Sequence, residues 1–231
     1  LYNAFIESMG DRAQVDVYIH HFDIKIFNTL ILENVHHYTD FVVMPCLFKK
    51  IYGTLNKVKG RVYILDQLPA EIGKKYPAVY QNFAKDMNQA LITAKTLLEK
   101  YYELVLVYPG GKEPPGIEEG FLKYCKDHNV MYRVIKNLEL EQLKKRRAYL
   151  VIDDLDLVSV VKQSKERGFV IGQDVGIVSF NDSPLKEVVA DGITTISTDF
   201  AAMGRALAEL ILQNKSIQIE NPSSVLIRSS L

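Results

Sequence analysis

Short, nearly continuous apolar runs recur along the chain, and segments with helical spacing separate most of them. The runs are rich in β-branched and aromatic residues, which is typical of strands covered on both faces. They occupy residues 15–19, 41–44, 62–65, 104–108, 130–135, 148–152 and 175–180. Apolar residues three or four positions apart predict helices over residues 24–35, 83–101, 117–128, 155–168 and 200–212. Strand and helix in alternation predict an α/β fold of parallel sheets flanked by helices.

Two segments depart from this alternation. Residues 1–9 predict a helix, although a parallel α/β unit normally opens with a strand, so we expect the first strand of this unit to lie upstream. Residues 137–147 lie between two predicted strands but are too few for a full crossover helix, and only about two helical turns can fit there. The absence of an initial Met also indicates a piece of a longer protein.

Composition excludes several classes of protein. The 231 residues include 28 basic and 28 acidic side chains, and this balance is unlike the basic excess of a nucleic-acid or anionic-membrane surface. Two cysteines, Cys46 and Cys125, are too few for a disulfide framework and indicate reduced thiols in a cytoplasmic protein. No apolar run approaches the ~20 residues that span a bilayer. We therefore expect no membrane contact.

Polar residues follow the predicted strands where ligands bind in an open parallel sheet. Asp66 follows one run, Tyr108 leads into a loop that contains Lys112, Asp153 follows a third run and Asn181 a fourth. The carboxyl ends of parallel strands converge at one edge, so these groups are expected to line one cleft. Carboxylates and amides can each satisfy two hydroxyl groups, and aromatic faces cover the apolar side of a sugar ring. The pattern favours a neutral, polyhydroxylated ligand.

Each of these residues also has a structural interpretation. Asp153 or Asp154 can cap the following helix, and Asp182 precedes Ser183-Pro184, an ordinary helix start. Asn181 is better placed for the cleft, while Asp66 is either a turn residue or a ligand contact. The loop at residues 109–111 is either a plain turn or a weak phosphate signal.

No arrangement of residues predicts catalysis or metal binding. The sequence has no nucleophile motif, phosphate loop or zinc spacing, and His20-His21 lacks a partner at metal-ligand spacing. We therefore expect a binding protein rather than an enzyme, with no cofactor and no metal.

Residues 153–231 resemble the effector-binding core of the LacI/GalR family of bacterial transcription regulators. The resemblance rests on short motifs in a matching order and spacing. These are Val151-Ile152-Asp153-Asp154-Leu155, Lys165-Glu166-Arg167-Gly168, Gln173-Asp174-Val175-Gly176-Ile177-Val178-Ser179-Phe180-Asn181-Asp182, Ile193-Thr194-Thr195-Ile196, Met203-Gly204-Arg205-Ala206-Leu207 and Val225-Leu226-Ile227-Arg228. The first two-thirds of the chain agree with the family only in pattern.

The resemblance implies a periplasmic-binding-protein-like fold of two α/β lobes joined by three crossings. It places residues 1–81 and 198–214 in the amino-terminal lobe, and residues 82–197 and 215–231 in the carboxyl-terminal lobe. Family members bind a ligand between the lobes, dimerise through this core and carry a separate amino-terminal DNA-binding domain. Similar cores are also fused to a GntR-type winged-helix domain.

The resemblance also assigns residues to the ligand. Asp66, Asp153 and Asn181 fall on sugar-contacting positions of the family, whereas Ile117 stands where the family has an arginine. Losing that bidentate donor disfavours an acidic or phosphorylated effector and shifts contacts to neighbouring residues. The expected ligand-binding residues are Asp66, Tyr108, Lys112, Glu113, Ile117, Asp153, Phe180 and Asn181.

Three functions remain to be compared. The first is a cytoplasmic, homodimeric core of a transcription regulator that senses a monosaccharide and reaches DNA only through a missing amino-terminal domain. We expect its dimer face near residues 49–58 and 86–98. The second is a periplasmic sugar-binding protein of a transport system, and the third is an enzyme. An upstream DNA-binding domain, a signal peptide or catalytic turnover distinguishes them.

Overall fold

The computed structural model describes residues 1–46, 48, 50–138 and 142–231, which form two compact units. Unit 1 comprises Leu1–Gln81 and Asp199–Pro222, and unit 2 comprises Asn82–Thr198 and Ser223–Leu231. The chain therefore passes between the units after Gln81, after Thr198 and after Pro222. The expected division differs at the last crossing, because residues 215–222 carry a strand that pairs within unit 1.

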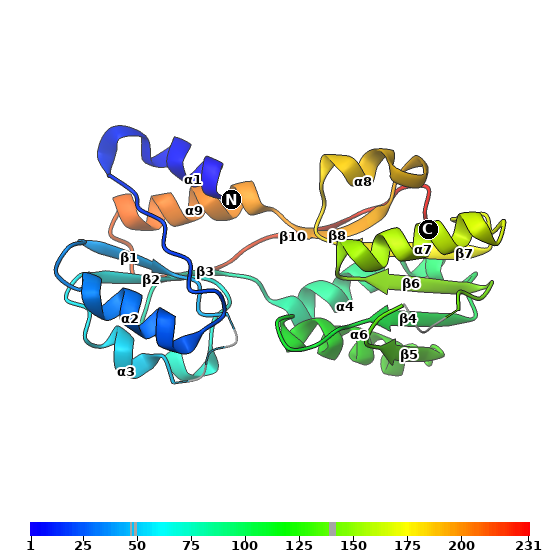
Figure 1. Ribbon diagram of the computed structural model, residues 1–231, viewed down its shortest axis with the longest axis horizontal. Coiled ribbons are helices and arrows are strands. Elements are labelled where there is room, and N and C mark those ends of the chain that lie inside the picture. Colours follow the sequence, from blue (N-terminus) through cyan, green and yellow to red (C-terminus); the bar gives the residue numbers. More distant parts are fainter. Residues whose placement is uncertain (47, 49, 139–141) are drawn as a thin grey trace. The chain divides into compact units, whose positions relative to one another are not determined.

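Unit 1 is a four-stranded sheet with helices on both faces. The strand order is β1-β2-β3-β9, and every pairing is parallel. Helices α1 and α9 pack on one face, and α2 and α3 pack on the other (Figure 1). Its elements are α1 Tyr2–Met9, α2 Ile24–Asn34, β1 Asp40–Val43, α3 Tyr52–Leu55, β2 Arg61–Asp66, β3 Ala78–Tyr80, α9 Phe200–Leu212 and β9 Gln218–Glu220, with short 3-10 turns at Gly10–Arg12 and Ala70–Ile72.

Local chemistry explains where the unit 1 helices begin and meet. The Asp23 carboxylate caps α2 by accepting a hydrogen bond from the Lys25 amide at 2.7 Å, and Asp199 caps α9 in the same way. Helix α1 packs directly on α9 at Gly204, where an added Cβ would lie 2.5 Å from the Leu1 carbonyl oxygen. Only glycine permits this approach, so the amino-terminal helix is tied to a helix late in the sequence.

The expected strand over residues 15–19 is wrong. In the described part of the chain these residues belong to no strand, and Val17, Tyr18 and Ile19 are exposed. Side chains hold the stretch instead, because the Tyr18 and Tyr38 hydroxyls lie 2.7 Å apart. An apolar run forms a strand only when neighbouring strands and covering helices bury it, and here they do not.

Unit 2 is a six-stranded sheet covered on both faces. Its order is β10-β8-β7-β6-β4-β5, and all pairings are parallel except the antiparallel edge strand β10. We expected parallel pairing throughout, but an antiparallel edge on such a sheet is common. Its elements are α4 Phe83–Thr93, α5 Lys95–Leu98, β4 Glu103–Val107, α6 Pro115–Asp127, β5 Tyr132–Ile135, β6 Arg147–Val151, α7 Asp154–Glu166, β7 Val175–Phe180, α8 Pro184–Val188, β8 Thr194–Thr198 and β10 Ser223–Leu226, with a 3-10 turn at Val189–Asp191.

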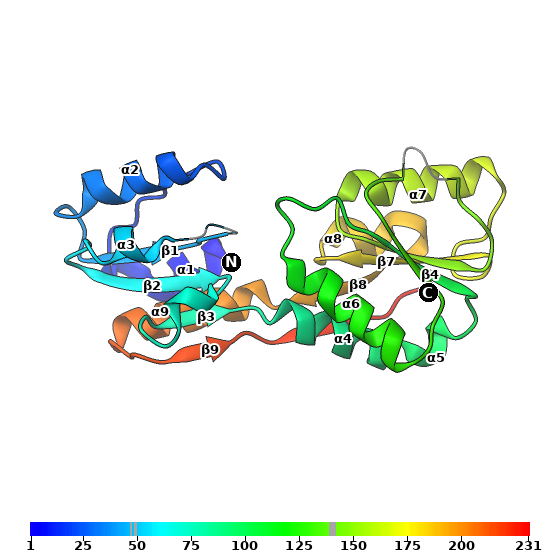
Figure 2. The same cartoon turned by 90° about the horizontal axis from the view of Figure 1, so that it is seen from below.

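The strands of unit 2 divide their side chains between two apolar cores. In β4, Leu104 and Leu106 face a core built with α4 and α6, whereas Val105 and Val107 face a core built with α7. This alternation follows from the two-residue period of a strand and explains the continuous apolar runs in the sequence. Figure 2 shows α4 and α6 on one side of the sheet and α7 on the other.

Two helix predictions need correction. The segment over residues 83–101 forms two helices rather than one, because Ala94 leaves the helical region with φ −84° and ψ 1°. The two turns expected within residues 137–147 are absent from the described residues 137–138 and 142–147, and the rest of that prediction lies outside the described chain. No helix in the described ranges has the length and apolar character needed to cross a bilayer.

Candidate functional site

The carboxyl edge of the unit 1 sheet is centred on Asp66, the last residue of β2. Asp66 has a left-handed backbone with φ 75°, and the Gln81 side-chain amide donates a 2.5 Å hydrogen bond to its carboxylate. Burial raises the pKa of the Asp66 carboxyl group, and the Gln81 hydrogen bond only partly opposes that shift. A half-buried carboxylate held by an amide is a ready acceptor for ligand hydroxyls.

His20 and Cys46 lie at the same edge. The Cys46 sulfur is 3.9 Å from His20 Nε2, and that nitrogen is 3.2 Å from the Met44 carbonyl oxygen. Burial raises the pKa of the Cys46 thiol, and the negative charge of Asp66 adds a smaller rise. The thiol is therefore neutral and not an activated nucleophile. The residues that the structure describes include no cluster of three or more side chains suited to a metal ion.

Aromatic rings complete this edge of unit 1. The His20 and Phe48 ring centroids are 5.0 Å apart, and those of Phe27 and Phe48 are 5.5 Å apart. The expected ligand-binding residues did not include His20, Phe48 or Gln81, although His20 follows the predicted strand over residues 15–19. Gln81 follows β3, which is too short to stand out as an apolar run, and the rings come from three separate segments.

The carboxyl edge of the unit 2 sheet brings together the ends of β4, β6 and β7. Tyr108 follows β4, and its hydroxyl donates a 2.9 Å hydrogen bond to the Glu113 carbonyl, closing the loop that carries Lys112. Burial, followed by the charge of Glu118, raises the pKa of the Tyr108 hydroxyl, so it remains protonated and can donate. Lys112 is exposed, and Glu113 is half-buried.

Asp153 combines the two roles expected from the sequence. Its carboxylate accepts a 2.6 Å hydrogen bond from the Leu155 amide, so Asp153 caps α7. One such bond uses only part of the acceptor capacity of a carboxylate. Asn181, at the end of β7, is exposed and has φ 59°, which asparagine tolerates better than most residues.

Asp182 does not cap α8. Its carboxylate forms a bidentate ion pair with Arg228 at 2.7 and 3.0 Å and accepts a 2.8 Å hydrogen bond from the Thr195 hydroxyl. Arg228 holds the pKa of the Asp182 carboxyl group below its usual value. The carboxylate therefore links the segment after β7 to the segment after β10 and does not cap α8.

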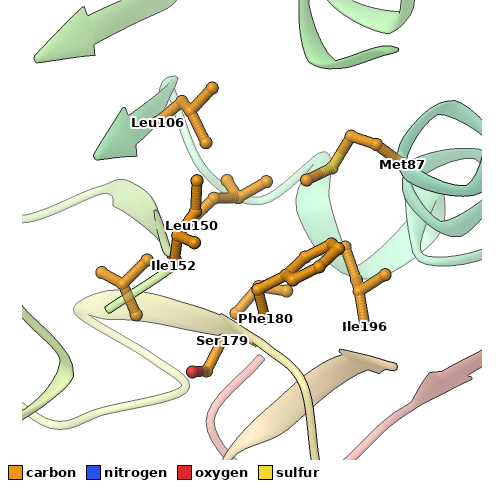
Figure 3. A pocket seen from close by; sticks show the side chains of 9 residues that line it. Met87, Leu106, Leu150, Ile152, Ser179, Phe180 and Ile196 are labelled. Atoms are coloured by element: carbon orange, nitrogen blue, oxygen red, sulfur yellow. The ribbon is translucent and has the colours of Figure 1, made fainter. Parts of the chain in front are cut away.

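Two expected ligand contacts are buried in the core of unit 2. Ile117 on α6 packs in the apolar cluster with the sheet, and its side chain presents no surface to a ligand. Phe180 is also buried and borders a cavity of about 10 Å³ together with Met87 and Ile196 (Figure 3). That volume barely holds one water molecule, so the cavity is a packing gap rather than a ligand site.

Each unit thus presents its own polar edge at the ends of its parallel strands. Asp66 lies in unit 1, and Tyr108, Lys112, Glu113, Asp153 and Asn181 lie in unit 2. Within unit 2, the exposed groups at the ends of three neighbouring strands can hydrogen-bond several hydroxyls of one ligand. The described arrangement offers hydrogen-bond acceptors and donors, and its thiol–imidazole contact, between Cys46 and His20, holds a thiol with a raised pKa.

Comparison with known proteins identifies the same architecture elsewhere. Residues 102–231 match the sequence profile of a family described as periplasmic binding protein-like domain. The HTH-type transcriptional regulator KdgR of Bacillus subtilis is 27% identical over 114 residues, covering 46% of this chain and 33% of that protein. The match therefore spans about a third of the length of this curated relative.

Two solved structures share the fold over nearly the whole chain. A periplasmic binding protein/LacI transcriptional regulator from Alkaliphilus metalliredigens, complexed with D-xylulofuranose, has a TM-score of 0.80 at 13% identity, covering 99% of this chain and 92% of that chain. The Lac repressor dimer bound to operator and the anti-inducer ONPF has a TM-score of 0.79 at 16% identity, covering 99% and 76%. The two-lobed fold and the resemblance to LacI-type effector-binding cores are confirmed.

Proposed function

Since this chain belongs to the family of periplasmic binding protein-like domains, we propose that it is the ligand-sensing core of a bacterial transcription regulator. The observation that carries the proposal is the polar edge of each unit, in a fold shared with a LacI-type regulator bound to a sugar. The curated relative KdgR, a transcriptional regulator, supports the same assignment. The protein acts in the cytoplasm as a binding protein rather than an enzyme.

The proposed ligand is a small neutral sugar contacted by residues of both units. Asp66 in unit 1 and Asp153 and Asn181 in unit 2 accept hydrogen bonds from sugar hydroxyls, and Tyr108, Lys112 and Glu113 supply further contacts from the loop after β4. The rings of His20 and Phe48 offer an apolar face of the kind that covers a sugar ring. Ile117 is buried in the core of unit 2 and is not one of the proposed ligand contacts.

The proposed mechanism is a population shift between arrangements of the two units. A sugar that contacts both units binds one arrangement more tightly and so favours it. A differential free energy of about 1–3 kcal/mol is enough for regulation. The favoured arrangement is relayed through a homodimer to DNA-binding domains, of a GntR or other type, elsewhere in the full protein.

A periplasmic sugar-binding protein is the alternative. The relative from Alkaliphilus metalliredigens is described with both terms, so the fold alone does not separate the two functions. The full gene discriminates between them. An encoded helix-turn-helix or winged-helix domain upstream supports the regulator, and an export signal supports the transport protein.

A thermal-shift screen of the chain against common monosaccharides tests the proposal. A specific sugar at about 100 times its Kd stabilises the folded chain by about 2.7 kcal/mol and raises its melting temperature. Asp153→Ala should reduce the shift, because it weakens binding by about 1–3 kcal/mol. Asp153→Ser is the matched control for stability, because serine retains the cap on α7 but not the carboxylate. A screen in which no neutral sugar raises the melting temperature contradicts the proposed ligand.

A further inference from the structure

A lysine is buried beside the polar edge of unit 2. Lys186 lies in the short helix α8 and is only 5% exposed, although lysine side chains are rarely buried unless they are paired. Moving an ammonium group out of water costs free energy that only close hydrogen bonds and an opposite charge offset. The partners of this lysine therefore indicate what it does.

All three N–H donors of the ammonium group have partners within the chain. Lys186 Nζ donates hydrogen bonds to the carbonyl oxygens of Phe180 at 3.0 Å and Asn181 at 2.8 Å. The same nitrogen lies 2.9 Å from a carboxylate oxygen of Asp154. Three partners match the three donors, so the group has no donor left for a ligand and acts on the protein itself.

The partners come from two chain segments that separate at this point of the sheet. The ladder between β6 and β7 ends where Val151 pairs with Ser179, and the two carbonyl groups lie beyond that pair on β7 and in the turn after it. Asp154 is the first residue of α7, which follows β6. Lys186 therefore bridges the ends of β6 and β7 where the backbone ladder no longer joins them.

Each bridged segment carries a candidate ligand residue. Asn181 has the left-handed φ of 59°, and its own carbonyl group is one of those that the ammonium holds. Asp153 directly precedes Asp154 and caps α7 through its 2.6 Å bond from the Leu155 amide. One ammonium group thus fixes Asn181 and Asp153 relative to each other. Groups that are already in place bind a ligand more tightly, because less ordering accompanies binding.

The backbone of Lys186 is itself held at both ends. Its amide donates a 2.9 Å hydrogen bond to the Ser183 carbonyl, and its carbonyl accepts a 2.7 Å bond from the Ile193 amide. The residue that carries the ammonium group is therefore anchored independently of the two segments that it joins.

We propose that Lys186 is the positioning residue of the candidate ligand site in unit 2. It sets Asn181 against Asp153 and does not contact the ligand itself. The inference rests on the proposed function and names a residue that determines how well the site binds.

Hydrogen exchange of the whole chain without ligand tests the bridge. Lys186→Met retains the unbranched stem and removes the ammonium group. The amides of Asn181 and Leu157, each hydrogen-bonded to a backbone carbonyl, should both exchange about 10-fold faster, because the two segments lose their shared partner. Lys162→Met, at an exposed position of α7, is the matched control and should change neither amide. Unchanged exchange at either amide in Lys186→Met overturns the inference.

A second variant keeps the test decisive if Lys186→Met does not fold by circular dichroism. Asp154→Asn removes the opposite charge at the exposed end of the bridge and retains a hydrogen-bond acceptor. The same two amides should exchange faster, by a smaller factor than in Lys186→Met. Faster exchange at Leu157 alone would show that Asp154 acts only on its own helix and would contradict the bridge.

Binding measurements separate this inference from the proposed function. Calorimetry uses D-glucose, D-galactose, D-fructose and D-ribose as probes. A probe that binds the wild type should bind Lys186→Met about 10-fold more weakly, and Asp153→Ala should cost less affinity in the Lys186→Met background than alone. Equal affinity of the wild type and Lys186→Met overturns the positioning role. If the wild type binds none of the probes, that result counts against the proposed neutral ligand, and the exchange measurement alone supports or overturns the bridge.

Discussion

The two units use the same α/β plan but differ in how consistently an apolar run of the sequence forms a strand. Strands β4 and β7 of unit 2 are buried at every position and lie between two apolar cores. In unit 1, β3 and β9 have only three residues each, and the edge strand β1 is only partly buried, as are the edge strands β5 and β10 of unit 2. Beside β1, residues 15–19 expose Val17, Tyr18 and Ile19. An apolar run therefore becomes a strand only where at least one neighbouring strand pairs with it, as β1 and β5 show at the edges of their sheets.

The largest expected effect is in the core of unit 2. Phe121 on α6 is completely buried among sheet and helix side chains, so Phe121→Ala should lower the free energy of unfolding by about 3–5 kcal/mol. Urea denaturation followed by circular dichroism measures the loss. A change below about 1 kcal/mol would mean that unit 2 is not held by this core.

In unit 1, the buried side-chain amide of Asn221 is expected to stabilise the fold. The Asn221 backbone amide donates to the Tyr80 carbonyl at 2.7 Å, and its side chain donates to the Asp199 carbonyl at 3.0 Å. Asn221→Ala removes the side-chain donor from a buried site and should destabilise the protein by about 1–3 kcal/mol in the same assay. Asn3→Ala, at an exposed position of α1, is the control and should change stability by less than about 0.5 kcal/mol.

The carboxylates Asp182 and Asp66 should give opposite pH dependence. Arg228 lowers the folded-state pKa of Asp182, so the ion pair stabilises the fold above the unfolded pKa of about 3.9, and this is lost as pH falls through the folded value. Burial raises the folded-state pKa of Asp66, so the ionised carboxylate destabilises the fold at neutral pH. This destabilisation disappears as pH falls from the folded-state pKa toward the unfolded-state pKa of about 3.9.

Denaturation measured between about pH 3 and pH 7 separates the two effects, because this range includes the unfolded-state pKa of an aspartate. Asp182→Asn should destabilise the protein by about 1–2 kcal/mol at neutral pH, and its effect should shrink as pH falls through the lowered folded-state pKa of Asp182. Asp66→Asn retains the acceptor for Gln81 and should stabilise the protein at neutral pH, with the gain vanishing in acid. Parallel pH profiles for wild type and both variants would disprove the assigned directions.

The smallest effect belongs to residues 15–19. Val17→Ser should change the unfolding free energy by less than about 0.5 kcal/mol, because Val17 is exposed and lies in no strand. Hydrogen exchange should show fast amides over residues 15–19 and strong protection in β7. Strong protection of residues 15–19 would show that this stretch is paired in solution and would remove the contrast between the units.

Local pattern predicted most of the fold because burial and periodicity are properties of neighbouring residues. Six of the seven apolar runs overlap strands, and α9 begins at Phe200 and ends at Leu212, as expected. Strands β3 and β9 were missed because three residues give no readable period. Strands β8 and β10 were missed because Thr and Ser interrupt their apolar positions. Their existence follows from parallel pairing between distant segments, such as Tyr80 with Glu220.

The site was predictable only in outline. Strand ends located Asp66, Asp153 and Asn181 because a parallel sheet gathers its loops at one edge. The roles of Asp182 and Ile117 were not predictable from local sequence. Asp182 pairs with Arg228, which is 46 residues away. Ile117 lies on the buried side of the first turn of α6, and the resemblance to the family gave its position in the sequence but not its burial. Long-range partners of this kind require the folded chain.

Isothermal titration calorimetry with the sugar found by the thermal screen tests the central claim most directly. Asp66→Asn removes a charge from unit 1, and Asp153→Ser removes a charge from unit 2 while retaining the helix cap. The proposed function predicts one sugar per chain and a loss of about 1–3 kcal/mol of binding free energy in each variant. Wild-type affinity in both variants would contradict the claim that the two polar edges hold the ligand.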